Sequence, residues 1–261
     1  MAERTFPDAW DPDRYGRFRE ERSAPFHDLL AMVERRPGMR VVDLGCGPGE
    51  LTRLAHETLG ARETLGIDSS PAMIARAGEQ ARPGLSFEVG NAGAFAGRGL
   101  DLVLSNAALH WVPDHEALLP RLAACLADGG QLAVQVPANE AHPSHAIARQ
   151  VAAEPPFRGA LGGHVRISPV LAPEAYARVL FRTGFPARRV RLEVYGHALA
   201  SRDEVAEWVR GTLLTDYQRR LPAPLWPAFL DRYRQRLAAA LPDHRPFLYT
   251  YRRLLLWARR P

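Results

Sequence analysis

The chain has 261 residues, of which 46% are hydrophobic and 24% are charged, and its formal net charge is +5. This length fits one large domain or one domain with a substantial insertion, and the apolar fraction excludes a chain that is mainly disordered. No apolar run approaches the ~20 residues that a membrane-spanning helix needs, so a spanning protein is also excluded.

The charged residues and the cysteines indicate which partners and which cellular compartment to expect. The N-terminus is charged and has no apolar stretch, so it does not match a secretory signal. Cys46 and Cys125 lie far apart, so we expect neither a disulfide framework nor a metal cluster, and a reducing cytoplasm is the default compartment. All 34 basic residues are arginines, whose forked donors suit carboxylates and phosphates. The high pI is compatible with nucleic-acid binding or with a small anionic substrate, but no run of five or six basic residues indicates a nucleic-acid tail. As partners we expect a small anionic substrate, no nucleic acid and no membrane, and as the assembly a monomer or weak dimer.

Short apolar runs alternate with helical patterns in the first half of the chain. Capping residues and a proline at Asp68-Ser69-Ser70-Pro71 indicate the start of one helix. The pattern predicts strands over residues 40–44, 63–67, 85–89, 100–105 and 131–136, and helices over residues 50–59 and 116–126. This alternation is typical of an α/β fold with a mostly parallel, twisted sheet and helices on both faces.

The second half of the chain is less regular. Residues 138–172 mix helical pieces with proline and glycine, which indicates a cap or loop. The remaining pattern predicts a helix over 173–183, a strand over 188–195, helices over 203–215 and 224–241, and a last strand over 247–257. Two helices between the last two strands are more than a short connection requires, so we expect a helical cap over a pocket.

Three glycines directly follow the first predicted strand, in Asp43-Leu44-Gly45-Cys46-Gly47-Pro48-Gly49. Glycine lets the backbone pass close to a ligand and adopts torsion angles that other residues resist. A dinucleotide-binding fingerprint would need glycine at position 50, where Glu50 stands, and no P-loop lysine follows. The spacing D-x-G-x-G-x-G instead resembles motif I of the class I S-adenosylmethionine-dependent methyltransferases. Asp68 ends the next strand, where an acidic side chain can accept hydrogen bonds from both hydroxyls of a ribose.

The resemblance implies a Rossmann-like fold and S-adenosylmethionine as cofactor, with S-adenosylhomocysteine as product. It also implies a set of cofactor contacts, which are Asp43, Gly45, Gly47, Gly49, Asp68, Ser69, Asn91, Ala92, Ser105, Tyr15 and Arg22. Asn91 stands where the superfamily often has an aspartate that faces adenine, and its amide oxygen can accept the same hydrogen bond. A plain turn is the alternative at this position.

A closer resemblance is to the trans-aconitate 2-methyltransferases, and it extends over nearly the whole chain. The segments that carry it are residues 10–15, 66–74, 105–115, 134–137, 143–145, 207–209 and 258–260. The resemblance implies methyl transfer to a carboxylate, which gives the monomethyl ester of trans-aconitate or of a similar polycarboxylate. A carboxylate with a pKa near ~4 is ionised at neutral pH, so in-line transfer needs no general base and no catalytic residue beyond positioning groups.

One departure from the family leaves the substrate open. His110 stands where the family usually has glutamine, which adds a possible positive charge. A methyltransferase of another small acid or of a secondary metabolite is therefore an alternative. A second alternative is a module that binds the cofactor and has no catalytic activity. A nucleic-acid methyltransferase is disfavoured because the fourth strand ends in Ser105-Asn106-Ala107-Ala108 and not in the N/D-P-P-Y signature.

A small polycarboxylate needs fixed donors when it leaves water. The predicted substrate contacts are His110 and Trp111, as positioning residues, with Tyr195, His197, Trp208 and Arg253. Core packing is the alternative for His110, Trp111 and Trp208, and a structural partner is the alternative for Arg253. We expect Tyr195 and His197 to end the sixth strand, with a purely structural role as their alternative. For Tyr15 and Arg22 the alternative is a solvated helix face. As domains we expect an N-terminal gate over residues 1–30, which contains Tyr15 and Arg22, and a cofactor-binding core over 31–137. Residues 138–261 would complete the sheet and add the helical substrate cap, within a single domain overall. No metal site is expected.

Overall fold

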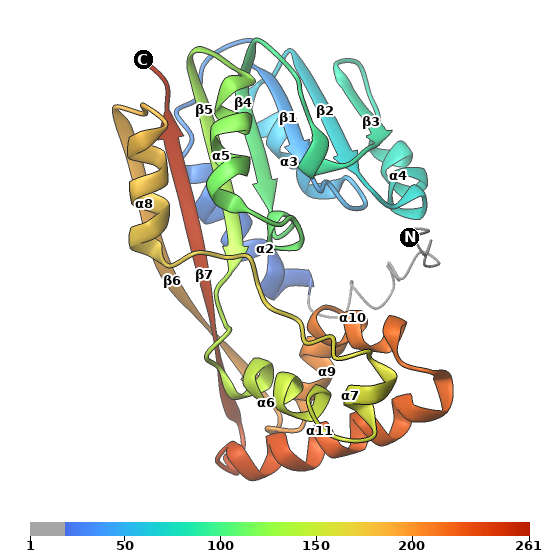
Figure 1. The fold of residues 1–261 in the computed structure, drawn as a ribbon. Helices are drawn as coiled ribbons and strands as arrows, with labels where there is room; N and C mark the ends of the chain where they lie inside the picture. The colour runs from blue at the N-terminus through green and yellow to red at the C-terminus, as the bar shows by residue number, and fades with distance from the viewer. Residues whose placement is uncertain (1–18) are drawn as a thin grey trace. The chain divides into compact units, whose positions relative to one another are not determined.

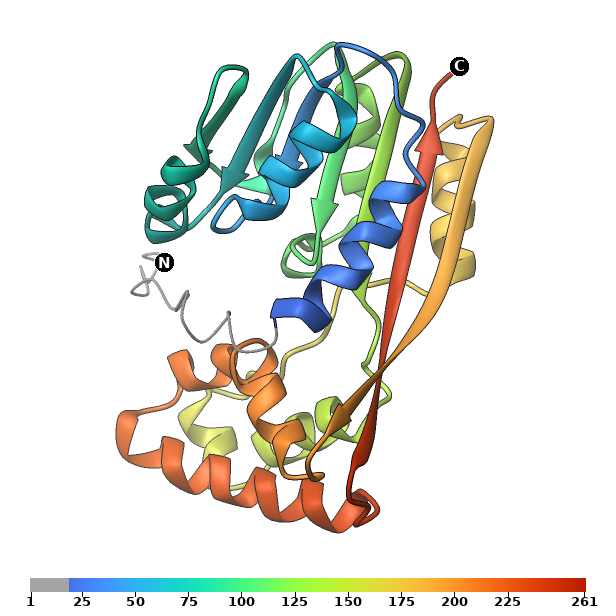
Figure 2. The same ribbon diagram turned by 180° about the vertical axis from the view of Figure 1, so that it is seen from behind.

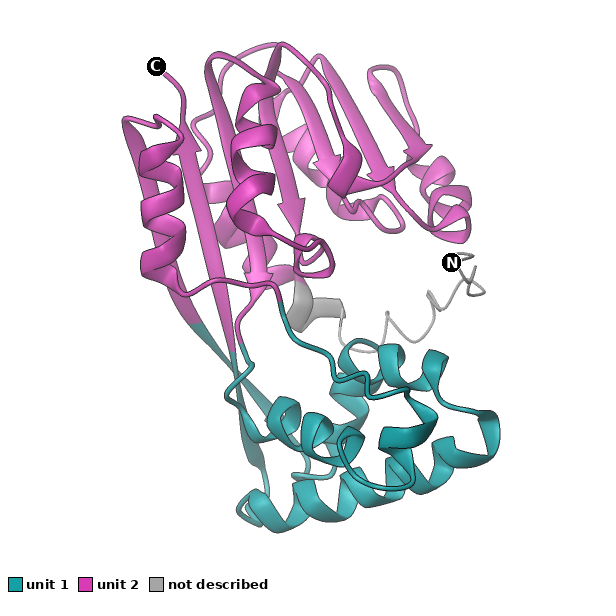
Figure 3. Cartoon of the chain, in the orientation of Figure 1, with its two compact units in different colours: residues 1–18, 139–168, 194–251 teal, residues 19–138, 169–193, 252–261 magenta. Residues whose placement is uncertain are grey.

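The computed structural model describes residues 19–261, with side chains from residue 23 onward, and divides them into two compact units (Figures 1 and 3). Unit 1 comprises residues 139–168 and 194–251, and unit 2 comprises residues 19–138, 169–193 and 252–261. The residues predicted to form the cap, from 138 onward, are thus shared between the units. No helix among the described residues has the length and apolar character that crossing a membrane requires.

Unit 2 is built on a mostly parallel sheet, as the sequence predicted. The strands are β1 (Arg40–Leu44), β2 (Glu63–Asp68), β3 (Leu85–Val89), β4 (Leu100–Asn106), β5 (Leu126–Pro137), β6 (Ala187–Leu199) and β7 (Phe247–Arg259). Their order in the sheet is β3-β2-β1-β4-β5-β7-β6. Neighbouring strands among β1 to β5 pair in parallel, whereas β7 pairs with β5 in the antiparallel sense. The carboxyl ends of the parallel strands therefore meet at one edge of the sheet.

Helices cover both faces of this sheet because its central strands are apolar on both sides. The helices of unit 2 are α2 (Arg19–Ala31), α3 (Glu50–Leu59), α4 (Pro71–Ala77), α5 (His115–Ala124) and α8 (Pro173–Arg182), with short 3-10 helices η1 (Gly78–Gln80), η2 (Ala92–Ala94) and η3 (Leu109–Trp111). Residues of α2 and α3 pack on the face that carries Val41 and Leu102 (Figure 2). Residues of α5 and α8 pack on the opposite face, which carries Val42 and Val103 (Figure 1).

Unit 1 is mainly helical and has its own core. Its helices are α6 (Pro143–Ala152), α7 (Phe157–Ala160), α9 (Glu204–Arg210), α10 (Leu213–Arg220) and α11 (Trp226–Ala240), preceded by η4 (Ala223–Leu225). They bury an aromatic cluster in which Phe229 lies 5.2 Å from Phe157 and 5.3 Å from Tyr217 between ring centroids. Buried aromatic side chains contribute large apolar areas, so this cluster gives unit 1 a core separate from that of the sheet.

Several predicted boundaries in the second half were wrong, each for a local reason. The single helix predicted over 203–215 is two helices, because α9 ends at a Gly211 C-cap and the backbone of Thr212 is not helical. Within the segment predicted as cap or loop, Pro143 at the first helical position and the His142 cap start α6. The strand predicted over 188–195 continues to Leu199, and the one predicted over 131–136 begins at Leu126, where a register shift interrupts its pairing with β4.

Candidate functional site

The turn between β1 and α3 holds three glycines in the left-handed region, with φ of 82° at Gly45, 54° at Gly47 and 82° at Gly49. A Cβ on Gly45 would lie 2.0 Å from the Cβ of Ala108, and one on Gly49 would lie 2.9 Å from the ring of Phe87. Packing therefore requires the outer two glycines. At Gly47 nothing lies within 4 Å of such a Cβ, so the turn opens to free space at its middle residue.

Asp68 joins the end of β2 to this turn. One carboxylate oxygen, Oδ2, accepts a hydrogen bond from the N–H of Gly47 at 2.9 Å, and Oδ1 accepts one from the N–H of Ser70 at 2.9 Å. A carboxylate offers about four acceptor positions and can accept several hydrogen bonds at once. Asp68 is half-buried and its neighbour Ser69 is exposed, so the acidic group reaches the surface beside the open side of Gly47.

Asp43 is the buried acidic residue of the turn, with 3% of its surface exposed. The hydroxyl of Thr52 donates to its Oδ2 at 2.6 Å, whereas Oδ1 has no hydrogen-bond partner among the described residues. The pKa of Asp43 is raised to about 6, chiefly by burial; the Thr52 hydrogen bond opposes this rise and the charge of Asp68 contributes to it. A buried acceptor without a partner is unfavourable, so Oδ1 fits a donor group of a bound ligand.

The polar side chains at the ends of β3 and β4 differ in their exposure to solvent. Asn91 is exposed and caps η2, with its Oδ1 accepting from the N–H of Gly93 at 2.8 Å. Ala92, the next residue, is half-buried. Ser105 is fully buried and its hydroxyl donates to the carbonyl of Leu44 at 2.6 Å. The side chain of Ser105 thus links β4 to β1 and is occupied, although the sequence assigned it to the cofactor.

Two further predicted cofactor contacts cannot be described. Tyr15 lies outside the residues that the structure describes. Arg22 belongs to α2, but its side chain is likewise outside the described part of the chain.

Beyond β4, the short helix η3 carries His110 and Trp111. Their ring centroids are 5.0 Å apart, His110 is half-buried, and 37% of Trp111 is exposed. The buried side chain of His115 fixes this helix, because its Nε2 lies 2.9 Å from the carbonyl of Leu109 and its Nδ1 contacts the hydroxyl of Tyr176. Since a carbonyl can only accept, Nε2 carries the proton and Nδ1 accepts from Tyr176. Burial lowers the pKa of His115, which agrees with this neutral ring.

Gln135, which was not among the predicted site residues, is a buried polar side chain near the end of β5. Gln135 is 0% exposed, and its Oε1 accepts from Nη1 of Arg253 at 3.4 Å. Arg253, a predicted substrate contact, lies on β7 and is 6% exposed. Asn106 is the residue opposite Gln135 on β4. A polar residue inside the apolar run Leu132-Ala133-Val134-Gln135-Val136 was the available signal for Gln135.

The other predicted substrate contacts belong to unit 1. The ring of His197 lies 4.5 Å from that of Trp208, and Trp208 is 2% exposed and packs against Tyr249 and Tyr251. Tyr195 is half-buried. The prediction that Tyr195 and His197 end their strand was wrong, because both lie inside β6. The buried, ring-packed environment of Trp208 favours its alternative role in the core.

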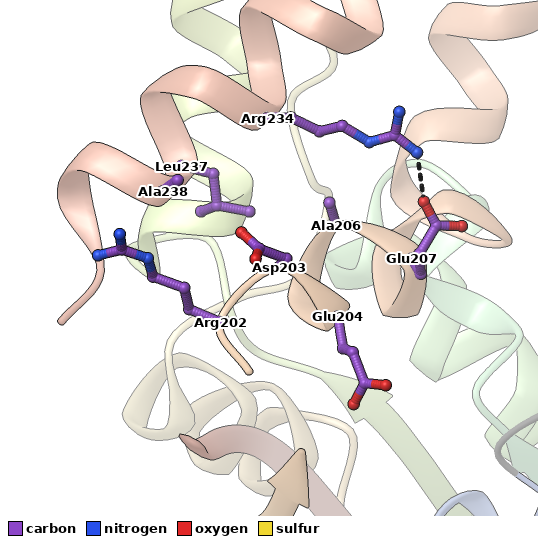
Figure 4. Close-up of a pocket in the computed structure, with 8 residues that line it drawn as sticks. All are labelled: Arg202, Asp203, Glu204, Ala206, Glu207, Arg234, Leu237 and Ala238. Carbon is purple, nitrogen blue, oxygen red and sulfur yellow. Dashed lines mark hydrogen bonds and ion pairs between the residues drawn. The ribbon is translucent and has the colours of Figure 1, made fainter. Parts of the chain in front are cut away.

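A separate pocket in unit 1, of about 300 Å³, contains none of the predicted site residues (Figure 4). It lies between α9 and α11, and it is lined by Arg202, Asp203, Glu204, Ala206, Glu207, Arg234, Leu237 and Ala238. Its charges are largely compensated: Arg234 pairs with Glu207, and Glu204 accepts from the N–H of Ala200 at 2.9 Å. Such paired surface charges do not form a dedicated anion site.

Comparisons with known proteins agree with this geometry. A family model described as a methyltransferase domain matches residues 15–188. A trans-aconitate 2-methyltransferase from Deinococcus radiodurans is 44% identical over 258 residues, which cover 97% of this chain and 98% of that protein. The YcgJ protein from Bacillus subtilis, with a TM-score of 0.60 at 16% identity, covers 91% of this chain and 98% of its own. An S-adenosylmethionine dependent methyltransferase from Mesorhizobium loti has a TM-score of 0.51 at 24% identity, with coverage of 91% and 98%. The two structures confirm the predicted Rossmann-like methyltransferase fold.

Proposed function

The chain belongs to the trans-aconitate 2-methyltransferase family, and on that premise we propose that it transfers a methyl group from S-adenosylmethionine to a carboxylate of trans-aconitate or a similar small polycarboxylate. The products are a monomethyl ester and S-adenosylhomocysteine. When bound, the cofactor supplies a methyl group on a sulfonium sulfur, which keeps the electron pair of the broken bond.

The observation that carries this proposal is the joined surface of the glycine turn and Asp68. The open space at Gly47 gives room for a ligand beside the turn, and the carboxylate of Asp68, which lies next to it, is an acceptor of the kind that binds ribose hydroxyls. The buried Oδ1 of Asp43 lacks a donor, and an ammonium or hydroxyl group of the cofactor would supply one. Donors and acceptors of the turn thus fit a nucleoside that carries an amino acid.

The described residues offer positioning and not base catalysis. A substrate carboxylate is ionised at neutral pH, so no residue has to remove a proton before transfer. Holding the nucleophilic oxygen in line with the methyl group and excluding water can supply roughly 7–11 kcal/mol of the barrier. We assign this positioning in unit 2 to His110 and Trp111 on η3, with Arg253 as an anion contact. Tyr195, His197 and Trp208 of unit 1, and the gate formed by residues 1–30, stay predictions from the family resemblance.

The buried, free thiols of Cys46 and Cys125 are in keeping with a reducing compartment, and we propose the cytoplasm. Burial raises the pKa of Cys46, which supports a structural role and not a reactive one.

A substrate panel tests the proposed reaction. Purified protein is incubated with S-adenosylmethionine and trans-aconitate, other polycarboxylates, a phenol or an amine, and methylated products are detected by mass spectrometry. A methyl ester of trans-aconitate supports the proposal. Turnover of the phenol or amine with no polycarboxylate ester would overturn the substrate class, and cofactor binding without any product would indicate a non-catalytic module.

A further inference from the structure

The side chain of Gln135 is completely buried in unit 2 and is only half satisfied. Its Oε1 accepts from Arg253, but its Nε2 has no hydrogen-bond partner among the described residues. A buried amide donor without an acceptor costs free energy that folding must supply elsewhere. Such a residue is expected at a binding site, where a ligand provides the missing acceptor.

Gln131 provides an internal comparison, because it lies four residues earlier on β5 and is also 0% exposed. Its Nε2 donates to the carbonyl of Glu34 at 2.8 Å. Its Oε1 accepts from the N–H of Glu34 at 2.8 Å and from Nε1 of Trp257 at 2.9 Å. One face of one strand thus carries a glutamine with a complete set of structural partners and, nearer the carboxyl edge of the sheet, a glutamine with an unused donor.

The sheet register gathers three polar residues around that donor. Asn106 on β4 pairs with Gln135 on β5, which pairs with Leu255 on β7. Arg253 lies two residues before Leu255 on β7 and therefore on the same face of the sheet. Oδ1 of Asn106 is also buried without a partner among the described residues. The next residue, Ala107, has a φ of 54° and donates its N–H to the carbonyl of Gln135 at 2.9 Å, so a strained backbone fixes this corner.

We propose that Gln135, Arg253 and Asn106 form a clamp for one carboxylate of the substrate, an inference that rests on the proposed methyl transfer to a polycarboxylate. The guanidinium of Arg253 and the free amide N–H of Gln135 are donors, and a carboxylate can accept from both. The Asn106 amide can rotate by half a turn without changing its shape, and it then presents a third donor.

The clamp takes a carboxylate other than the one that is methylated. Hydrogen bonds from a guanidinium stabilise the negative charge of a carboxylate, and a stabilised oxygen is a weaker nucleophile. Methyl transfer therefore proceeds at a second carboxylate, which the clamp leaves unbound. This makes Gln135 a specificity-determining residue that selects acids with two or more carboxylates over monocarboxylates.

The test compares Gln135→Met with the matched variant Gln131→Met. Binding of trans-aconitate and of crotonate, a monocarboxylate, is measured by calorimetry with S-adenosylhomocysteine present, and thermal unfolding is recorded. Gln135→Met should weaken trans-aconitate binding roughly 10- to 100-fold, with crotonate binding and cofactor affinity unchanged. Its unfolding temperature should change less than that of Gln131→Met, because it removes an unsatisfied donor and only one long hydrogen bond, the 3.4 Å contact with Arg253. Gln131→Met should lower the unfolding temperature and leave trans-aconitate affinity unchanged.

Two outcomes would overturn the clamp: unchanged affinity for trans-aconitate in Gln135→Met, or an equal loss for trans-aconitate and crotonate. Gln135→Glu gives a second check, since a carboxylate beside Arg253 should abolish trans-aconitate binding. If the wild-type protein methylates no polycarboxylate, the proposed function fails, and the clamp is then judged by binding of tricarballylate, a saturated tricarboxylate. The clamp is supported if the wild type binds tricarballylate and Gln135→Met does not. It is overturned if the wild type does not bind tricarballylate.

Discussion

The carboxylate of Asp68 accepts a hydrogen bond from the N–H of Gly47 at 2.9 Å, which ties the end of β2 to the glycine turn after β1. The bond holds Gly47, the middle glycine of the turn, against the strand that carries the acidic group. A ligand that contacts the turn therefore meets the carboxylate at a fixed position, and this preorganisation lowers the entropy cost of binding.

Because the space at Gly47 is open, adding one methyl group there, as in Gly47→Ala, should interfere with cofactor binding. Gly47→Ala and Gly60→Ala are matched, because φ is 54° and 59° and neither added Cβ meets an atom within 4 Å. Each should cost about 1–2 kcal/mol of unfolding free energy through its left-handed backbone. Only Gly47→Ala should also weaken S-adenosylmethionine binding, by roughly tenfold or more. Urea unfolding and calorimetry measure both quantities, and equal cofactor affinity in the two variants would contradict the position of the ligand.

The raised pKa of Asp43 predicts how stability depends on pH. The pKa is about 6 in the folded protein against an ordinary value of 3.8, so the folded state favours the protonated acid. The stability that Asp43 contributes is fully present below pH 3.8 and is lost as the pH rises through about 6. Asp43→Asn should therefore gain roughly 3 kcal/mol relative to the wild type between those limits. Urea unfolding of both proteins across this pH range measures the difference in their unfolding free energies. A difference that does not change with pH would contradict the raised pKa of Asp43.

The same group predicts the pH dependence of cofactor binding. If the ionised Asp43 accepts from an ammonium or hydroxyl group, S-adenosylmethionine affinity should fall as the pH drops through about 6. At pH 5 the loss should reach roughly tenfold, because about a tenth of Asp43 is then ionised in the free protein. Calorimetric titrations at several pH values measure this. An affinity that stays constant in the wild type, or that falls equally in Asp43→Asn, would exclude Asp43 as the responsible group.

His115 and Tyr176 predict an indirect effect on the substrate. Tyr176→Phe removes the hydroxyl that contacts Nδ1 of His115, and it should cost roughly 1–3 kcal/mol of stability. Since His115 holds the carbonyl of Leu109, η3 should lose its fixed position and the KM for trans-aconitate should rise, with S-adenosylmethionine affinity unchanged. Tyr233→Phe removes another buried hydroxyl, bonded to the carbonyl of Ser144 at 3.0 Å, and serves as control. The same KM in both variants would contradict the positioning role.

A substitution at Arg253 should affect the binding of the substrate and not that of the cofactor. Arg253→Gln should raise the KM for trans-aconitate roughly 10- to 100-fold, because it removes a charge-assisted contact, and should leave S-adenosylmethionine affinity intact. Its exposed neighbour Arg252 carries the same charge, so Arg252→Gln controls for a general electrostatic effect. Equal loss of both ligands, or loss of folding, would indicate that Arg253 is structural.

The sequence predicted those features whose causes are local. The strand rhythm, the glycine turn and Asp68 at the end of β2 all follow from periodicity and spacing within short windows. The break between α9 and α10 was missed because helical spacing continues past Gly211 and Thr212. Gln135 could not be selected, because its burial depends on a register that joins it to Asn106 and to Arg253, which is 118 residues away. The occupied hydroxyl of Ser105 depends in the same way on the neighbouring strand.

The cofactor site is tested most directly by the affinity of S-adenosylmethionine for wild-type protein and for Asp68→Ala, measured by isothermal titration calorimetry. Glu63→Ala, at the exposed start of the same strand, is the control. The wild type and the control should bind the cofactor saturably, and Asp68→Ala should lose roughly 1–3 kcal/mol of binding free energy. Unchanged affinity in a folded Asp68→Ala variant would contradict the assignment of this carboxylate to the ribose, and with it the proposed cofactor site.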